Sequence, residues 1–164
     1  MKHSLQRIEY ERLNARQKES YNFQKISAVL ADFGYVTIRL SDDWKGADFL
    51  AQHIGGHTLR VQLKSRLMLA KTYLKKDLWI TFRRKDTWFL FPHDEIVKVV
   101  LKKTKIGKTR SWAVRGRYSF PKISKQMQGI LKPYQIMQEV GAKKALQPTS
   151  QPRFARLVGD VGAS

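Results

Sequence analysis

Three polar residues, Asp48, Gln62 and Lys64, have the types and spacing needed for metal-assisted chemistry on a phosphate group. From Leu59 to Lys64 apolar and polar residues alternate, as in a half-buried strand, so Gln62 and Lys64 share one face. Carboxylate and amide oxygens bind hard divalent cations, and a lysine ammonium is a compact positive charge suited to a polyanion. The pattern therefore indicates a divalent-metal site for phosphodiester chemistry, provided that the fold brings Asp48 to the same face.

The segment before Gln62 predicts an antiparallel hairpin that starts at Asp48 and turns at a glycine-containing loop, residues 55–57. A two-residue loop at the glycines would place Asp48 opposite Leu63, on the wrong side of the sheet. A three-residue loop over residues 55–57 would place Asp48 opposite Lys64 and beside Gln62. The chemistry requires this second register, and we predict it.

The chain resembles the PD-(D/E)XK nuclease superfamily, whose motif is an aspartate, a hairpin, and an acid or glutamine two residues before a lysine. Here the motif is Ala47-Asp48 followed by Gln62-Leu63-Lys64. Ala47 replaces a proline that members often lack. Gln62 replaces an acid, and its amide oxygen binds a hard cation more weakly than a carboxylate does. Some restriction and homing endonucleases of the superfamily carry the same QxK variant.

The resemblance implies a restriction-endonuclease-like α/β fold: a mixed central sheet flanked by helices, with a core in the order helix, three strands, helix, strand. It implies that Mg²⁺ or Mn²⁺ is held by Asp48, Gln62, the Leu63 carbonyl and an acid of the first helix, with Lys64 orienting or activating water. The enzyme implied is a Mg-dependent endodeoxyribonuclease that leaves a 5′-phosphate and a 3′-hydroxyl. Similar small restriction and homing endonucleases and junction resolvases usually assemble as dimers or larger, so a homo-oligomer is implied as well.

Glu19 is the candidate for the helical acid. The pattern of residues 9–33 predicts one helix. Because a helix turns by about 100 degrees per residue, Glu19 lies on the same side of it as Ile26. The carboxylate is therefore expected on the core side. The alternative is that the helix has passed the core by Glu19, which would leave the acid in solvent. The apolar stripe of this helix contains Asn22, Phe23, Ile26, Val29, Leu30 and Phe33.

The rest of the pattern predicts one α/β domain, residues 1–139, and a flexible polar and basic tail, residues 140–164. A chain of 164 residues with 42% apolar composition is large enough to bury one core. Further strands are predicted at residues 35–40, 78–83, 88–91 and 111–120. The second and third form a hairpin beside the motif strands, and the fourth is interrupted at Gly116.

Short helices are predicted after Asp94 and after Pro121. The neighbouring His93, Asp94 and Glu95 also resemble a metal cluster. We prefer the interpretation that Asp94 caps the helix and Glu95 belongs to its first turn, because acids are favourable there without any metal.

The chain has 32 Lys and Arg against 13 Asp and Glu, a formal net charge of +19 and a pI of about 10.4, so a polyanion is the expected partner. The excess lies after residue 50, where 24 basic residues accompany six acidic ones. Trp112, in the most basic stretch, could stack on an unpaired base or fill the core, and we prefer the core. The candidate DNA contacts are Lys71, Lys75, Lys76, Arg83, Arg84, Lys102, Lys103, Lys105, Lys108, Arg110, Arg115 and Arg117.

Cysteine is absent, which excludes disulfides, thiolate nucleophiles and cysteine-based zinc sites. The sequence contains no long apolar span or signal-like N-terminal pattern, so an intracellular, cytoplasmic protein without membrane association is expected. The main alternative function is a non-catalytic nucleic-acid-binding protein with a nuclease-like fold, because Gln62 weakens the motif. Dependence of turnover on a divalent metal and on Lys64 distinguishes the two.

Overall fold

The computed structural model describes residues 5–136, without the side chains of Asp43 and Trp44. The tail predicted for residues 140–164 and the domain boundary before it lie outside this range. The elements, with η for a 3-10 helix, are η1 (Tyr10–Arg12), α1 (Ala15–Ala31), β1 (Tyr35–Trp44), β2 (Ala47–His53), β3 (Thr58–Lys64), β4 (Met68–Ala70), η2 (Lys71–Tyr73), β5 (Leu78–Arg84), β6 (Thr87–Pro92), α2 (His93–Lys103), η3 (Ile106–Lys108), α3 (Arg110–Ala113), β7 (Arg117–Ser119), α4 (Lys125–Leu131), η4 (Lys132–Tyr134) and β8 (Gln135–Ile136).

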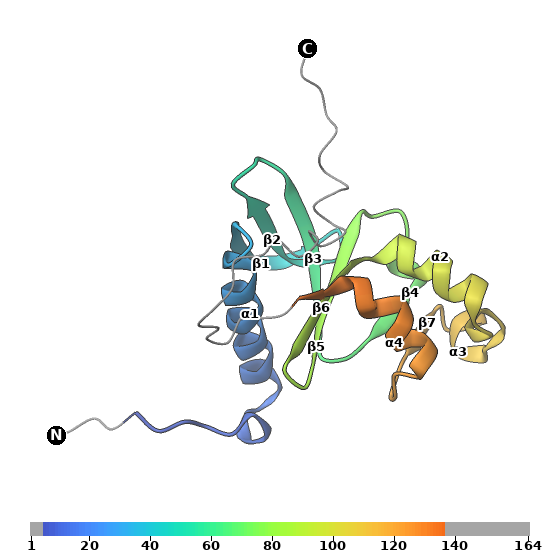
Figure 1. Cartoon of the computed structure of the whole chain (residues 1–164), viewed down its shortest axis with the longest axis horizontal. Helices are drawn as coiled ribbons and strands as arrows, with labels where there is room; N and C mark the ends of the chain where they lie inside the picture. The colour runs from blue at the N-terminus through green and yellow to red at the C-terminus, as the bar shows by residue number, and fades with distance from the viewer. Residues whose placement is uncertain (1–4, 137–164) are drawn as a thin grey trace, which may run out of the picture.

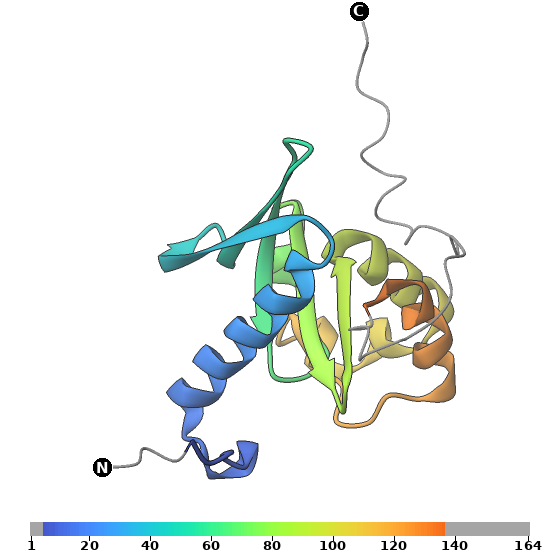
Figure 2. The ribbon, with the colours of Figure 1, turned by 60° about the vertical axis from the view of Figure 1, so that its left-hand side comes forward.

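A six-stranded mixed sheet in the order β1-β2-β3-β5-β6-β8 forms the centre of the molecule. One hydrophobic cluster packs α1 against one face of this sheet, and a second packs α2 and α4 against the other face. The two layers are visible on either side of the strands in Figure 1 and, after rotation, in Figure 2. The predicted fold class, a mixed central sheet flanked by helices, is confirmed. No helix in the described part of the chain is long and apolar enough to cross a membrane.

Helix α1 begins later than predicted, because Asn14 forms a capping box. The Asn14 side chain accepts the Gln17 backbone N–H, and the Gln17 side chain accepts the Asn14 backbone N–H, each at 2.9 Å. These bonds satisfy donors that a helix start leaves unpaired, so residues 10–12 form the separate η1. The predicted stripe is confirmed farther along, where Ile26 and Leu30 are fully buried.

Replacing Asn14 with Ala should lower the free energy of unfolding by about 1 kcal/mol, because the helix loses a side-chain acceptor at its cap. Urea denaturation followed by circular dichroism measures the change. The matched control is Asn14→Ser, which keeps an acceptor and should retain most of the stability. Equal losses in the two variants would contradict a capping role for Asn14.

The β2–β3 hairpin has a different loop from the predicted one. The His53 N–H donates to the His57 carbonyl at 2.8 Å, so the three loop residues are Ile54 to Gly56, with Gly56 at φ 94°. The paired register ends at Phe49 opposite Val61, and its continuation places Asp48 opposite Gln62. The prediction that Asp48 pairs with Lys64 is therefore wrong by two positions. The predicted shared face is confirmed, since a shift of two preserves the alternation of a strand.

Strand β3 runs parallel to β5, while β5 and β6 form the predicted antiparallel hairpin. A parallel pair needs a crossover, and the resemblance implied a helix there. The crossover consists instead of the short β4, the single turn η2 and the connecting residues up to Leu78. This route places Tyr73, the last residue of η2, near the end of β3.

The strand predicted at residues 111–120 is wrong for its first half, which forms α3. The Thr109 side chain caps α3 by accepting the Trp112 backbone N–H, and Gly116 at φ 67° makes the turn into β7. Trp112 is buried in the cluster under α2, which confirms the core interpretation. The helix predicted after Pro121 starts at Lys125, because Ser124 caps it.

Candidate active site

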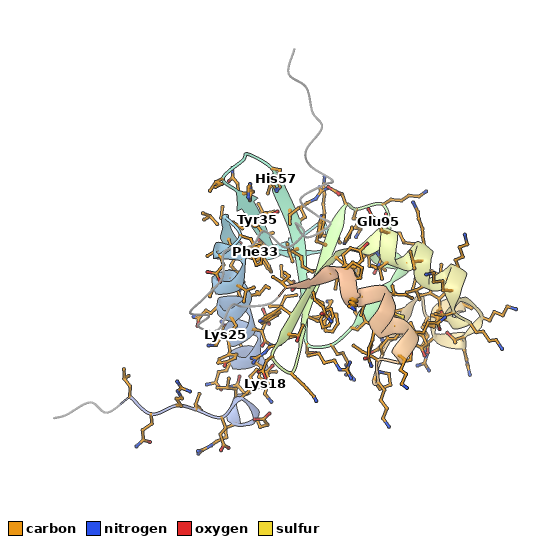
Figure 3. All side chains as sticks on the ribbon, in the orientation of Figure 1. Lys18, Lys25, Phe33, Tyr35, His57 and Glu95 are labelled. Atoms are coloured by element: carbon orange, nitrogen blue, oxygen red, sulfur yellow. The ribbon has the colours of Figure 1, made fainter. Side chains whose placement is uncertain are left out.

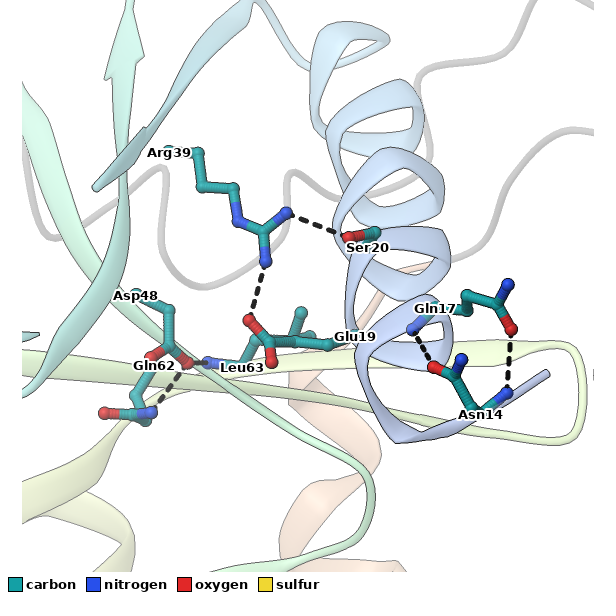
Figure 4. Close-up of polar contacts among 8 residues, drawn as sticks. All are labelled: Asn14, Gln17, Glu19, Ser20, Arg39, Asp48, Gln62 and Leu63. Atoms are coloured by element: carbon teal, nitrogen blue, oxygen red, sulfur yellow. Dashed lines mark hydrogen bonds and ion pairs between the residues drawn. The ribbon is translucent and has the colours of Figure 1, made fainter. Parts of the chain in front are cut away.

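Asp48 lies where the hydrogen-bonded register of β2 and β3 stops. Its Oδ2 atom accepts the Gln62 Nε2–H at 2.6 Å and the Leu63 backbone N–H at 2.7 Å (Figure 4). The carboxylate thus occupies the position at which β3 would otherwise bond to another backbone group. The structure brings together the two residues that the motif separates by fourteen positions.

Gln62 is one of the few buried polar residues, with 7% of its surface exposed. Its amide nitrogen, rather than its oxygen, faces Asp48. A cation between the two side chains would need the Gln62 amide oxygen, rather than the nitrogen, on the side of Asp48. Rotation of the amide group by a half-turn exchanges the two atoms, which occupy equivalent positions. Gln62 can therefore serve either as a donor to Asp48 or as a ligand beside it.

Lys64 lies two residues beyond Gln62 on the same face of β3. The parallel register pairs Gln62 with Ile80 and Lys64 with Phe82, two residues of the cluster covered by α2 and α4. The Lys64 Nζ atom lies 5.3 Å from the centre of the Tyr73 ring. This cation–π contact restrains the ammonium near the end of β3. Nothing in the sequence pattern pointed to Tyr73, because the contact depends on the path of the crossover.

Glu19 is not on the core side, which corrects the prediction. Its side chain is 61% exposed, and its Oε1 atom lies 2.7 Å from Nη2 of Arg39, whose Nη1 also donates to Ser20 (Figure 4). The reason is geometric: the buried part of α1 ends at Asn22, one helical turn away. The alternative of a solvated acid describes Glu19 better, with the addition of the Arg39 ion pair.

Glu19 and Asp48 nevertheless border one cavity of about 520 Å³. The cavity lies between the first half of α1 and the segment where β1 and β2 diverge. Glu19 borders it from the helical layer, and Asp48 borders it from the sheet. Its other lining residues are Arg16, Ser20, Arg39, Leu40, Ser41, Asp42 and Ala47. Arg39 thus holds the helical acid at the rim, a role that the sequence pattern did not indicate.

The residues of this site fit a hard divalent cation by the chemistry of their donors. Two carboxylates, an amide oxygen and a backbone carbonyl are oxygen ligands of the kind that Mg²⁺ and Mn²⁺ take. Among residues 5–136 no group of three or more histidine, aspartate or glutamate side chains is arranged to hold a metal. A cation here would therefore depend on Gln62 and the Leu63 carbonyl as well as on Asp48 and Glu19.

His93, Asp94 and Glu95 are held by structural contacts. Asp94 does not cap α2, which corrects that prediction: Pro92 occupies the cap position, and Asp94 Oδ2 accepts the Lys75 backbone N–H at 2.9 Å. Asp94 Oδ1 lies 3.1 Å from His93 Nδ1, while His93 Nε2 accepts the Ala70 backbone N–H at 3.3 Å. His93 and Asp94 thus tie the crossover to α2, whereas Glu95 Oε2 accepts the Tyr134 hydroxyl of η4 at 3.3 Å.

His93 should make the stability of the protein fall in mild acid. Burial lowers the pKa of His93 below its ordinary value of 6.5, although Asp94 opposes part of this shift. The unfolded chain then binds the proton more readily, so the free energy of unfolding should decrease as pH falls below 6.5 and level off below the folded-state pKa. Thermal melting across this pH range measures the effect. His93→Gln should flatten the dependence, and an unchanged slope in that variant would contradict the assignment.

The predicted DNA contacts fall into two groups. Lys71, Lys75 and Lys76 belong to the crossover, and Arg83 and Arg84 to the end of β5. The other group, Lys102, Lys103, Lys105, Lys108, Arg110, Arg115 and Arg117, comes from α2 to β7, in the layer opposite α1 (Figures 1 and 3). That layer covers the face of the sheet to which Gln62 and Lys64 belong, so this second group shares a side of the sheet with the candidate catalytic residues.

Comparisons with known proteins give one structural likeness to report. No family model and no curated protein matches the chain. Among solved structures, Hjc, a Holliday junction resolvase from Archaeoglobus fulgidus, matches with 15% sequence identity and a TM-score of 0.40. The match covers 48% of this chain and 75% of that protein.

Proposed function

We propose that this protein is a metal-dependent endonuclease of the PD-(D/E)XK type that hydrolyses DNA phosphodiester bonds. The observation that supports this most directly is the contact of Asp48 with the Gln62 amide and the Leu63 N–H at the point where β2 and β3 separate. Lys64 follows on the same face, and the net charge of +19 favours a polyanionic substrate.

In this proposal Asp48, Gln62, the Leu63 carbonyl and Glu19 hold Mg²⁺ or Mn²⁺. The cation, when bound, would polarise the scissile phosphate and lower the pKa of a coordinated water. Gln62 turns its amide oxygen toward the cation. Glu19 leaves its ion pair with Arg39 and becomes a ligand of the cation instead. Arg39 is then left beside the cavity, where its guanidinium can bind a phosphate oxygen.

Lys64 supplies positive charge where the attacked phosphate gains negative charge. Its stem is partly buried on β3 and its ammonium is held over Tyr73, so the charge needs little reorganisation during the reaction. Lys64 also orients the attacking water. The basic residues of the α2 to β7 layer bind the DNA backbone without reading its sequence. A homo-oligomer would provide a second site for the second strand.

The test is cleavage of supercoiled plasmid and of branched DNA by the purified protein with Mg²⁺, Mn²⁺ or EDTA. The expected result is nicking or linearisation with either metal and none in EDTA. Ligation of the products identifies the ends, since a 5′-phosphate and a 3′-hydroxyl permit resealing. Cleavage that persists in EDTA would overturn the metal mechanism.

The second candidate function is a non-catalytic nucleic-acid-binding protein. Two observations favour it: Glu19 is engaged by Arg39, and the Gln62 amide presents its nitrogen to Asp48. Such a protein would bind DNA with an affinity that falls steeply with salt and does not respond to Mg²⁺ beyond ionic strength. Tight binding in EDTA without cleavage of any substrate would select this alternative.

A further inference from the structure

A second cavity, of about 270 Å³, also borders α1 but shares no lining residue with the Glu19 cavity. It is formed where η1 and α1 cross the ends of β3 and β5. Ser65, which follows Lys64 directly, forms part of its wall, so the cavity begins one residue beyond the candidate catalytic lysine. Its lining residues are Tyr10, Glu11, Asn22, Ser65, Arg83 and Lys85.

The inner wall carries hydrogen-bonding groups with a defined direction. Asn22 is 8% exposed, and its Nδ2–H donates to the Tyr10 hydroxyl at 2.8 Å. No described residue donates a hydrogen bond to Asn22 Oδ1, so this acceptor can take a donor that enters the cavity. The Tyr10 hydroxyl already accepts from Asn22, so its own hydrogen is available for donation.

Tyr10 is held in place before any ligand arrives. Its ring packs against Tyr21 with centroids 5.4 Å apart, and the Lys18 ammonium lies 5.4 Å above it. Figure 3 labels Lys18 near the N-terminal end of α1. A site whose polar groups are fixed in advance loses less entropy on binding.

The outer rim carries positive charge. Arg83 donates to the Lys85 carbonyl at 2.7 Å and to Asp86 at 3.1 Å, but the Asp86 side chain is 99% exposed and easily displaced. Lys85 has φ 53° because it is the first residue of the two-residue loop between β5 and β6, where positive φ is usual. The loop thus presents the Lys85 side chain at the rim of the cavity.

We infer that this cavity binds one unpaired nucleotide of a DNA strand, with the base against Asn22 and Tyr10 and its phosphate at Arg83 and Lys85. This inference rests on the proposed function only in taking the bound strand to be DNA. It deepens that function by naming the substrate class. The nucleotide would lie on the α1 side of the sheet at the end of β3, and the substrate would be DNA with unpaired strands.

The polar groups also predict which base is preferred. Asn22 Oδ1 and the Glu11 carboxylate are acceptors, so they suit the exocyclic amino group of cytosine. Thymine has a carbonyl oxygen in place of this amino group. That oxygen would face the Asn22 and Glu11 acceptors with no hydrogen between them to form a hydrogen bond. The Tyr10 hydroxyl can donate to the N3 atom of cytosine. Cytosine should therefore bind more tightly than thymine, although flexible thymine strands usually suit non-specific single-strand binders.

The experiment measures the binding of fluorescein-labelled dC and dT decamers and of a duplex by fluorescence anisotropy, in EDTA and above neutral pH so that cytosine stays unprotonated. The full-length protein should bind the dC decamer about five- to tenfold more tightly than the dT decamer, the value of one or two hydrogen bonds. Asn22→Leu should abolish this preference and leave duplex affinity unchanged. The matched control, Gln24→Leu on the exposed side of α1, should keep the preference.

Lys85→Gly tests the rim separately and does not disturb the buried wall. It should weaken both decamers equally, by about two- to threefold for one phosphate contact, and raise the melting temperature, because glycine adopts a positive φ more readily than lysine. Melting curves show whether Asn22→Leu is folded; if it is not, Tyr10→Phe should lower the dC preference without exposing the core.

Equal affinity of the wild-type protein for the two decamers would overturn the inference, as would a preference that survives in folded Asn22→Leu. These outcomes are distinct from failure of the proposed function, because binding is measured in EDTA and requires no cleavage. A dC preference without nuclease activity supports the cavity alone. Cleavage without any base preference supports the nuclease and rejects the nucleotide cavity.

Discussion

Asp48→Asn should lower the rate of metal-dependent cleavage by about a hundred- to a thousandfold, an effect comparable to removing one main electrostatic group from an active site. Asparagine has the shape of aspartate but lacks the negative charge that would attract a divalent cation. Its amide oxygen can still accept both hydrogen bonds that Asp48 Oδ2 receives from Gln62 and Leu63, so the substitution mainly removes the charge. The rate is measured by single-turnover cleavage with saturating protein.

The control for this experiment is Asp77→Asn. Asp77 pairs with Arg60 at 2.9 Å, and its side chain is 81% exposed. This variant removes the same charge from the protein and should cleave at the wild-type rate. DNA affinity of Asp48→Asn in EDTA should equal that of the wild-type protein or exceed it. Unaltered cleavage by Asp48→Asn would show that the motif aspartate is not part of the site.

Lys64→Met should reduce cleavage by about a hundred- to a thousandfold while weakening DNA binding only by the value of one phosphate contact. Methionine keeps the unbranched apolar stem against the Tyr73 ring but removes the ammonium that lies 5.3 Å from it. Lys64→Arg should restore binding more than cleavage, because a guanidinium presents its charge in a different geometry. Rates and affinities are measured separately, so an effect on binding alone is recognised.

Lys98→Met is the matched control, since Lys98 is an exposed lysine on α2. It should leave cleavage unchanged. A Lys64→Met protein that cleaves normally but binds more weakly would make Lys64 a simple phosphate contact. That result, together with active Asp48→Asn, would move the assignment to the non-catalytic binding protein.

Much of the fold follows from local patterns. The alternation around Gln62 predicted a strand, the stripe containing Ile26 predicted α1, and the polar run after Arg83 predicted the β5–β6 hairpin. Each prediction depends on side chains that repeat within one element, where the spacing of residues determines which of them share a face. The capping box at Asn14 was also readable in the sequence, but the longer helical pattern concealed it.

The errors occurred where a short polar contact outweighs the wider pattern. Residues 111–113 have strand-like composition, yet the Thr109 side chain caps a helical turn there and Trp112 fills the core. Asp94 looks like a cap, yet it bonds to the Lys75 backbone in the crossover. The hairpin loop lies one residue earlier than predicted, because His57 already pairs with His53 and Gly56 takes the left-handed conformation within the loop.

The sequence by itself determined that Gln62 and Lys64 share a face and that an aspartate precedes them across a hairpin, and its net charge of +19 favoured a polyanionic partner. Only the tertiary structure decided that Asp48 meets Gln62, that Tyr73 holds Lys64, and that Glu19 is paired with Arg39. It alone revealed the cavity at Asn22. The physical reason is that periodicity orients side chains within one element, whereas contacts between elements depend on loop closure, strand register and the path of the crossover.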